Sequence, residues 1–381
     1  MKHLESNKKI FISIGNANEL AHVANEPLPS QFYNYIVGYH HAAKALIEQT
    51  LNSADEFSEY IKREKLRLCV IPACFLYRQY LELSLKDIYI RFSDDNEDAK
   101  KKKIYKVSHK LEKIWKCTKP LIEKTITEED KEQLVTLESY VLEFAHEDPF
   151  SIKYRYPITQ ELTPTIPNER DINIRNMMVR MDEVEWFLAG VVSSLEVNQL
   201  QKECAQHREN ALKYCDQKEY ILAIEHYKKA LDGKKQWSET HPDLVTGYAE
   251  IADIYFKQDD LNNASDYYLK SVDLHNKIHD NKTEAPIYLS YIYNFIGLIY
   301  KKQKKYDLAI EYYTKALENP NITDFDKNNS YSDLARVYRN MNEAFKSKQF
   351  YEMAMNIRIK LFGENSNSVI VLRNEIKKLT Y

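Results

Sequence analysis

The second half of the sequence contains a pattern that recurs after 41, 45 and 38 residues, and it limits the fold more than any other feature. Three strings carry it: LAIEHYKKAL at 222–231, NASDYYLKSV at 263–272 and LAIEYYTKAL at 308–317. Each string places small side chains on one helical face, with Tyr227, Tyr268 or Tyr313 between them. A helix that cannot bury its apolar face alone stacks on its neighbours, so the period predicts a solenoid of helix pairs.

A second set of strings supplies the first helix of each pair: RENALKYC, YAEIADIYFKQ, YNFIGLIYKKQ and YSDLARVYRN. In each, a small residue lies three positions before a tyrosine, as in Ala252 and Tyr255. This arrangement resembles the tetratricopeptide repeat, and ETHPDL and RIKLFGENS resemble its kinesin-light-chain-like variety. The resemblance implies about four repeats and a capping helix, SVIVLRNEIKKL, in a domain of residues 201–381.

The resemblance also implies an inner groove, lined by the first helices, that binds a protein or peptide partner. By repeat position, six side chains project into it: Arg208, Asn294, Lys301, Lys302, Arg336 and Arg339. Most of them are cationic, so we expect the partner to present an acidic segment or a C-terminal carboxylate. The alternative for Lys301 and Lys302 is that they solvate a helix end.

Residues 1–200 lack this period and are expected to form a helical bundle, which makes the whole chain all-α. Apolar spacing predicts helices at 31–52, 55–91, 107–124, 128–146 and 171–200, with a break at Pro72. The start around NEPLPSQ is expected to be irregular. Four prolines within HEDPFSIKYRYPITQELTPTIPNE, residues 146–169, predict an extended or hairpin-like insertion.

A narrow charged line crosses the helix predicted from FLYRQYLELSLKDIYI, residues 75–90. Arg78, Glu82 and Lys86 are spaced i, i+4 and i+8, so they share one face of an otherwise apolar helix. Together with SHKLEKIW and DPFSIKYRYP, this stretch resembles the HEPN domains of bacteria over about residues 30–195. Those domains are small helical bundles found in RNA-cutting toxins and antiviral effectors.

The HEPN resemblance implies metal-independent cleavage of RNA, in which an imidazole transfers protons and a guanidinium stabilises the phosphorane. His109 and Arg78 would fill these roles, oriented by Glu82 and Lys86. The sequence departs from the active pattern, because no Arg is followed by His after four to six residues, and Arg91 precedes His109 by 18. Either the two groups converge from separate helices, or the domain does not cleave RNA and the charges pair at a helix or dimer seam.

A lysine-rich run, KKKKIYKVSHKLEKIWKCTK at 100–119, has aromatic residues interleaved with nine lysines. Such a run suits contact with RNA phosphates and bases. The expected nucleic-acid-binding residues are Lys102, Lys103, Lys106, Lys110 and Arg155. The alternative is a solvated helix that begins after the acidic loop DDNED.

Several classes of protein are disfavoured. The five cysteines include no CxxC pair, and His40 and His41 diverge by about 100° on a helix, so we expect no metal site. No glycine-rich phosphate loop occurs, so we expect no cofactor. No stretch reaches the length of a signal peptide or membrane span, which favours a cytoplasmic protein without membrane contact.

Two functions remain in view from the sequence. One is an RNA-directed effector in phage defence or stress response, in which the repeats bind a regulatory partner. The other is a non-catalytic adaptor or peptide-sensing regulator that acts through the repeats. In both cases the first half is expected to form a homodimer, because polar stripes of HEPN-like domains face a shared cleft.

Overall fold

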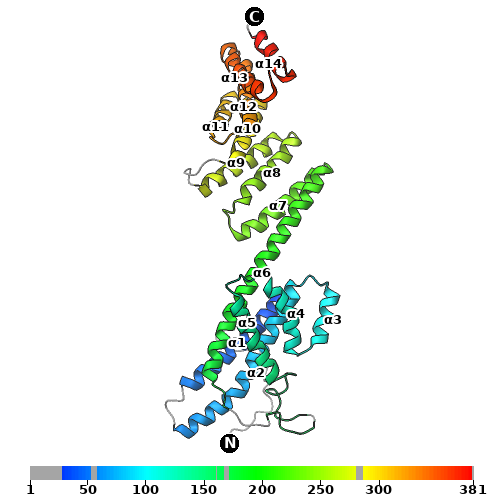
Figure 1. The fold of residues 1–381 in the computed structure, drawn as a ribbon, viewed down its shortest axis with the longest axis vertical. Helices are drawn as coiled ribbons and strands as arrows, with labels where there is room; N and C mark the ends of the chain where they lie inside the picture. The colour runs from blue at the N-terminus through cyan, green and yellow to red at the C-terminus, as the bar shows by residue number, and fades with distance from the viewer. Residues whose placement is uncertain (1–27, 53–57, 160, 167–170, 280–285, 380–381) are drawn as a thin grey trace, which may run out of the picture. The chain divides into compact units, whose positions relative to one another are not determined.

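The computed structural model describes residues 28–52, 58–159, 161–166, 171–279 and 286–379 (Figure 1). The chain divides into two compact units, residues 1–197 and 198–381, and the boundary lies within helix α6 (Ile174–Asp216). Across the described ranges there is no β-strand, and an isolated antiparallel bridge joins Ile158 to Pro164. The all-α fold predicted from the sequence is confirmed.

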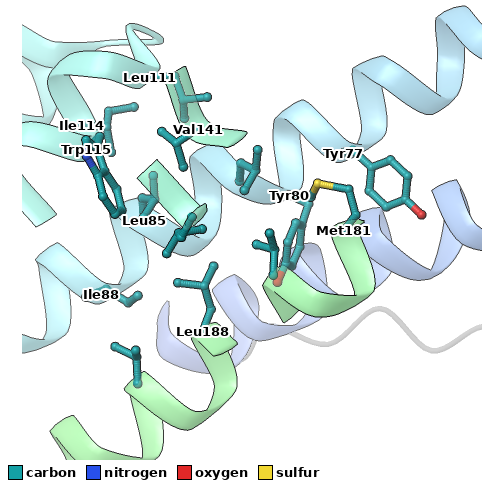
Figure 2. Packing of buried hydrophobic residues seen from close by; sticks show 14 of the residues in the cluster. Tyr77, Tyr80, Leu85, Ile88, Leu111, Ile114, Trp115, Val141, Met181 and Leu188 are labelled. Atoms are coloured by element: carbon teal, nitrogen blue, oxygen red, sulfur yellow. The ribbon is translucent and has the colours of Figure 1, made fainter. Parts of the chain in front are cut away.

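The first unit is organised around α2. The helices of this unit are α1 (Leu28–Asn52), α2 (Glu59–Phe92), α3 (Glu97–Val107), α4 (Leu111–Glu123), α5 (Lys131–Glu147) and the first part of α6. All six residues of α2 from Tyr77 to Glu82 are buried, so neighbouring elements cover every side of this stretch. Figure 2 shows the apolar part of this core, where Leu85 of α2, Trp115 of α4, Val141 of α5 and Leu188 of α6 pack together. A polar side chain on the buried stretch must therefore find its partner inside the unit.

Three helices of this unit differ from the sequence prediction. The helix expected at 107–124 begins at Leu111, because Ser108 ends α3 with a positive φ of 49°. The helix α2 continues through Pro72. The carbonyl that loses its hydrogen-bond donor there belongs to Leu68, a residue that is 69% exposed to water. The helix expected at 171–200 continues to Asp216, since no Gly or Pro interrupts the sequence there.

The predicted insertion is irregular wherever the structure describes it, at 148–159 and 161–166. Residues 160 and 167–169 of that insertion lie outside the described part of the chain. So do residues 25–27 of the expected irregular start and residues 55–57 of the helix expected at 55–91. The segment NEPLPSQ ends inside α1, which begins at Leu28.

The second unit consists of consecutive helix pairs. After the end of α6 these are α7 (Tyr220–Trp237), α8 (Asp243–Lys257), α9 (Leu261–His279), α10 (Ile287–Lys302), α11 (Tyr306–Glu318), α12 (Asp324–Asn340) and α13 (Ala344–Phe362). The segment expected to cap the stack forms α14 (Asn367–Lys378). Thr323 shows why α12 begins where it does, since its hydroxyl accepts a hydrogen bond from the Asp326 N–H at 3.0 Å.

The same turn joins the two helices of each pair. A residue with φ near +60° ends the first helix, and the following N–H donates to the carbonyl of a tyrosine five residues earlier at 2.9 Å. The left-handed residues are Lys218, Asp259, Lys304 and Asn342, and the acceptors are Tyr214, Tyr255, Tyr300 and Tyr338. Four equivalent turns show four structural repeats. None of the left-handed residues is glycine, so the sequence alone did not mark these turns.

Small and large side chains alternate between the paired helices as the pattern required. Ala223, Ala264 and Ala309 are fully buried, and so are the rings of Tyr268 and Tyr313. A Cβ added at Gly297 would lie 2.8 to 3.0 Å from three ring atoms of Tyr313. Glycine at 297 is thus what lets α10 approach the tyrosine of α11.

Candidate functional site

The guanidinium of Arg78 is buried, and protein groups surround it on three sides. Its Nη1 donates to Glu82 Oε2 at 2.8 Å, and its Nη2 donates to the carbonyl of His109 at 2.5 Å. Its Nε donates to the carbonyl of Asp148 at 3.2 Å and lies 3.7 Å from the carboxylate oxygen Oδ2 of the same residue. The guanidinium therefore ties together α2, the turn before α4 and the start of the insertion.

Glu82 is the centre of this cluster. While Oε2 faces Arg78, Oε1 accepts from Lys86 Nζ at 2.7 Å and lies 2.8 Å from His109 Nδ1. Burial acts to raise the pKa of Glu82, but the hydrogen bond and charge of Lys86, followed by the charge of Arg78 and the bond to His109, hold the pKa below its ordinary value. Glu82 is thus an ionised carboxylate in the interior, compensated by cations and hydrogen bonds.

Asp148 fastens the insertion onto this cluster. Its Oδ1 accepts from the N–H groups of Ile152 at 2.8 Å and Lys153 at 3.1 Å. Ser151, held at a positive φ of 59°, accepts at its hydroxyl from Gln79 Nε2 at 2.9 Å. The segment DPFSIKYRYP therefore lies against the Arg78 end of the charged line of α2.

The four expected catalytic residues come together, although in a different arrangement from the expected cleft. Arg78 is completely buried and Lys86 nearly so, whereas the side chain of His109 is 49% exposed. The N–H groups of Arg78 donate to Glu82 and to two main-chain carbonyls. The buried guanidinium is therefore not placed to contact a phosphate from solvent. Of the proton-transfer groups in the cluster, His109 is the one that solvent reaches.

The lysine-rich run is divided by the turn at 108–110. Lys102, Lys103 and Lys106 lie exposed on α3, with Tyr105 beside them and 88% exposed. Lys110 lies in the turn, its Nζ 5.6 Å from the centre of the Phe150 ring. Further along, Lys116 and Lys119 form ion pairs with Glu112 and Glu138.

Arg155 lies in the insertion rather than on the lysine-rich helix. It is exposed, with its guanidinium carbon 5.6 Å from the Phe75 ring and Nη2 3.5 Å from Ser151 Oγ. The continuous track of cations expected from the sequence is thus limited to α3 and the turn that follows it.

The cations expected in the groove of the repeats each face a carboxylate. Arg208 pairs with Glu250 of the next repeat, and Arg339 pairs with Glu375 at 2.6 Å. Lys302 pairs with Asp259 at 2.7 Å. The sequence prediction missed these partners because they lie on other helices or, for Asp259, in the turn after α8. The surface carries alternating charges rather than a uniformly positive field.

Asp333 is shared between two of these cations. Its Oδ1 accepts from Lys301 Nζ at 2.7 Å and from Arg336 Nη1 at 2.8 Å. Nearby, Asn294 accepts from the Ser330 hydroxyl at 2.6 Å, while its buried amide nitrogen makes no hydrogen bond. A surplus positive charge and an unsatisfied amide donor thus occur on adjacent first helices.

The first two repeats contain a pocket that the sequence did not indicate. It has a volume of about 540 Å³ and lies beside the Arg208–Glu250 pair. Trp237 and His241 line one part of it, with rings stacked at 5.5 Å between centroids. Aromatic and charged side chains together suit a protein segment more than a small apolar molecule.

His40, His41 and Glu185 form the group in the described residues that could hold a metal ion, with potential ligand atoms within 4.8 Å of one another. In the part of the chain that the structure describes, every helix is too short or too polar to span a membrane.

Comparison with known families identifies the repeats. Sequence models described as tetratricopeptide repeat match residues 202–277, 290–319 and 329–368. The second unit therefore contains tetratricopeptide repeats, as predicted, and repeats of this kind indicate interaction with other proteins. The matches all lie in the second unit, so the HEPN resemblance of the first unit stays a prediction.

None of the curated proteins matches the chain. Among solved structures, BtubC (BKLC) from P. vanneervenii is similar at 17% identity over 48% of this chain and 82% of that one, with a TM-score of 0.39. A MamA protein is similar at 19% identity over 47% and 88%, with a TM-score of 0.33. Pseudomonas aeruginosa PilF is similar at 16% identity over 54% and 87%, with a TM-score of 0.32.

Proposed function

We propose that this protein is an adaptor whose repeats bind a segment of a partner protein through a carboxylate on that segment. The observation that carries the proposal is the sharing of Asp333 by Lys301 and Arg336. Two cations on one carboxylate leave one positive charge uncompensated. The Arg336 side chain is 50% exposed, so this charge is available to a ligand.

The geometry of arginine supports a carboxylate as the group recognised there. One Arg336 nitrogen, Nη1, is engaged with Asp333, and a guanidinium has further N–H donors in its fork. Arg358 adds positive charge near Arg336, and it donates only to neutral acceptors: Asn328 Oδ1, the Ser368 carbonyl and Ser332 Oγ. An acidic side chain or chain terminus would relieve this accumulation of charge.

Selection of peptides on the full chain tests the proposal. A displayed library of random peptides with free C termini supplies ligands, and the best is then synthesised with a free and with an amidated terminus. Arg336→Glu should weaken binding at least tenfold, whereas Lys229→Glu should not, because that exposed lysine pairs with Glu225 on a second helix. Equal binding to wild type and Arg336→Glu would show that this surface is not the binding site.

Dimerisation through the first unit is a second part of the proposal. Arg78 already has carboxylate partners within its own chain, so the charged line no longer requires a second copy. Support comes instead from exposed apolar side chains, among them Leu68 on α2 and Trp186, 80% exposed, on α6. Light scattering on wild type, Leu68→Ser and Trp186→Ser measures the mass, and a monomeric wild type would refute the dimer.

Metal-independent RNA cleavage is a second candidate function, and His109 is the observation that favours it. A half-exposed imidazole held by a buried carboxylate is oriented for proton transfer, and the exposed lysines of α3 lie just before it in the chain. Incubation with defined RNAs in a chelator should then give cleavage that His109→Ala abolishes and His146→Ala leaves intact. Absence of cleavage by wild type would leave the adaptor function alone.

A further inference from the structure

His40 of α1 is completely buried, yet neither of its ring nitrogens makes a hydrogen bond. The atom Nε2 lies 3.4 Å from Asp182 Oδ1, and Nδ1 lies 3.5 Å from Glu185 Oε2. Asp182 Oδ1 is also buried without a hydrogen bond. Both carboxylates come from α6, so the unsatisfied groups meet where α1 and α6 face each other.

Carboxylate oxygens thus face both nitrogens of one buried ring. A neutral imidazole has one N–H donor and one lone pair, so one of its nitrogens must face a carboxylate oxygen with no proton between them. A metal cation removes this repulsion, because it accepts a lone pair from nitrogen and attracts the carboxylate.

A third ligand lies next to the first. His41 follows His40 on α1, and donor atoms of His40, His41 and Glu185 all lie within 4.8 Å of one another. Bonds of about 2.0 to 2.2 Å to a tetrahedral ion place ligand atoms roughly 3.4 Å apart. The donor atoms must therefore approach one another from within 4.8 Å to this shorter separation. The side chains of the exposed His41 and the half-exposed Glu185 can rotate to do so, while the buried His40 stays fixed.

The residues behind His40 complete the arrangement. With Nδ1 turned toward Glu185, the opposite nitrogen Nε2 is turned toward Asp182. Asp182 is held in turn by Lys44, whose Nζ donates to Oδ2 at 2.7 Å. A histidine that binds metal through one nitrogen commonly donates its other N–H to a carboxylate, which fixes the ring orientation.

We propose that His40 Nδ1, His41 and Glu185 bind a divalent transition-metal ion of the zinc class, which joins α1 to α6. Two imidazoles and one carboxylate suit zinc, whereas calcium and magnesium prefer oxygen ligands. The exposed side, at His41, leaves a fourth position for water. The sequence argued against a metal here because His40 and His41 diverge on one helix, and the carboxylate that joins them, Glu185, lies far along the chain.

Zinc and cobalt binding to the full chain tests the site. Protein freed of metal by a chelator and dialysed is titrated with ZnCl₂ by calorimetry, and with CoCl₂ while the visible absorption of four-coordinate cobalt is recorded. We expect one equivalent to bind, a cobalt band to appear, and the melting temperature of the wild type to rise with zinc.

His41→Ala and Glu185→Gln should each lose that equivalent, the cobalt band and the thermal shift. His146→Ala, an exposed histidine of the same unit, should keep all three. Asp182→Asn should retain the cobalt band but bind zinc about 10- to 100-fold more weakly, as expected for a positioning residue. Zinc held at His207 and His226, whose Nδ1 atoms lie 3.0 Å apart, would persist in every one of these variants. If His41→Ala binds as much zinc as wild type, with the same affinity, the site does not exist.

Discussion

Arg78 and Glu82 form an ion pair at 2.8 Å in which neither side chain reaches solvent. A buried pair is not in itself evidence of high stability, because removing two charges from water is costly. Its two members nevertheless depend on each other, since the loss of either one would leave the other with fewer opposite charges around it in the interior. The pair therefore fixes which groups must surround it: Lys86, His109 and Asp148.

Arg78→Ala should destabilise the first unit by about 3 to 5 kcal/mol, because Glu82 and Asp148 lose a buried cation and two carbonyls lose a donor. Chemical denaturation followed by circular dichroism measures this change. Arg67→Ala is the matched control on the same helix, since Arg67 is exposed and pairs with Glu64 at the surface, and its effect should be within about 0.5 kcal/mol. Equal stability of the two variants would contradict the structural role of Arg78.

Stability in acid should depend on Glu82. The pKa of this carboxyl in the folded chain lies below its ordinary value of 4.5, so the unfolded chain binds the proton more tightly. The contribution of ionised Glu82 is therefore complete above the unfolded pKa and is lost as the pH falls through the folded pKa. Between about pH 5 and 3, the free energy of unfolding should fall more steeply for wild type than for Glu82→Gln.

Urea denaturation in a series of buffers gives these slopes. Glu128→Gln removes an exposed carboxylate of the same unit and should leave the wild-type slope unchanged. Parallel slopes for wild type and Glu82→Gln would mean that Glu82 does not titrate differently in the folded chain.

The repeats were predictable from the sequence because their signal is local. Within one helix, Ala and Tyr at fixed spacing specify which face is buried, and the neighbouring repeat supplies the same pattern again. The charged line of α2 was visible for the same reason, since i and i+4 spacing depends on one helix only.

The features of the fold and of the site that the sequence did not predict depend on contacts between distant segments of the chain. The Asp148 carbonyl, the His109 carbonyl and the Asp333 carboxylate accept bonds from helices far away in sequence, and no periodicity reports them. The turn at Ser108 was missed because neither Gly nor Pro marks its left-handed backbone. Arg78 was therefore assigned to a cleft although other elements cover it completely.

Gly297→Ala should destabilise the third repeat by about 1 to 3 kcal/mol, because the new methyl group would overlap the Tyr313 ring and an aromatic ring cannot bend away. Gly190→Ala is the opposite control. An added Cβ there meets no atom within 4 Å, so better helix propensity should stabilise α6 by about 0.5 to 1 kcal/mol. Thermal denaturation measures the melting temperature of each variant. A shift of both melting temperatures in the same direction would contradict the contact between Gly297 and Tyr313.

Two equivalent tyrosines of the repeats should respond in opposite ways to loss of the hydroxyl. The rings of Tyr268 and Tyr313 are both fully buried, but the Tyr268 hydroxyl donates to Asp253, whereas the Tyr313 hydroxyl makes no hydrogen bond. Burial raises the pKa of Asp253, while the hydrogen bonds from Tyr268 and Tyr291 act to lower it.

Tyr268→Phe removes one of these two donors and should cost about 1.5 to 3 kcal/mol. Tyr313→Phe removes an unsatisfied polar group and should leave stability unchanged or raise it by up to about 1 kcal/mol. Urea denaturation of both variants, each compared with wild type at pH 7, measures the difference. Since the two changes delete the same atom from equivalent positions, an equal loss of stability would show that the hydrogen bond to Asp253 does not distinguish them.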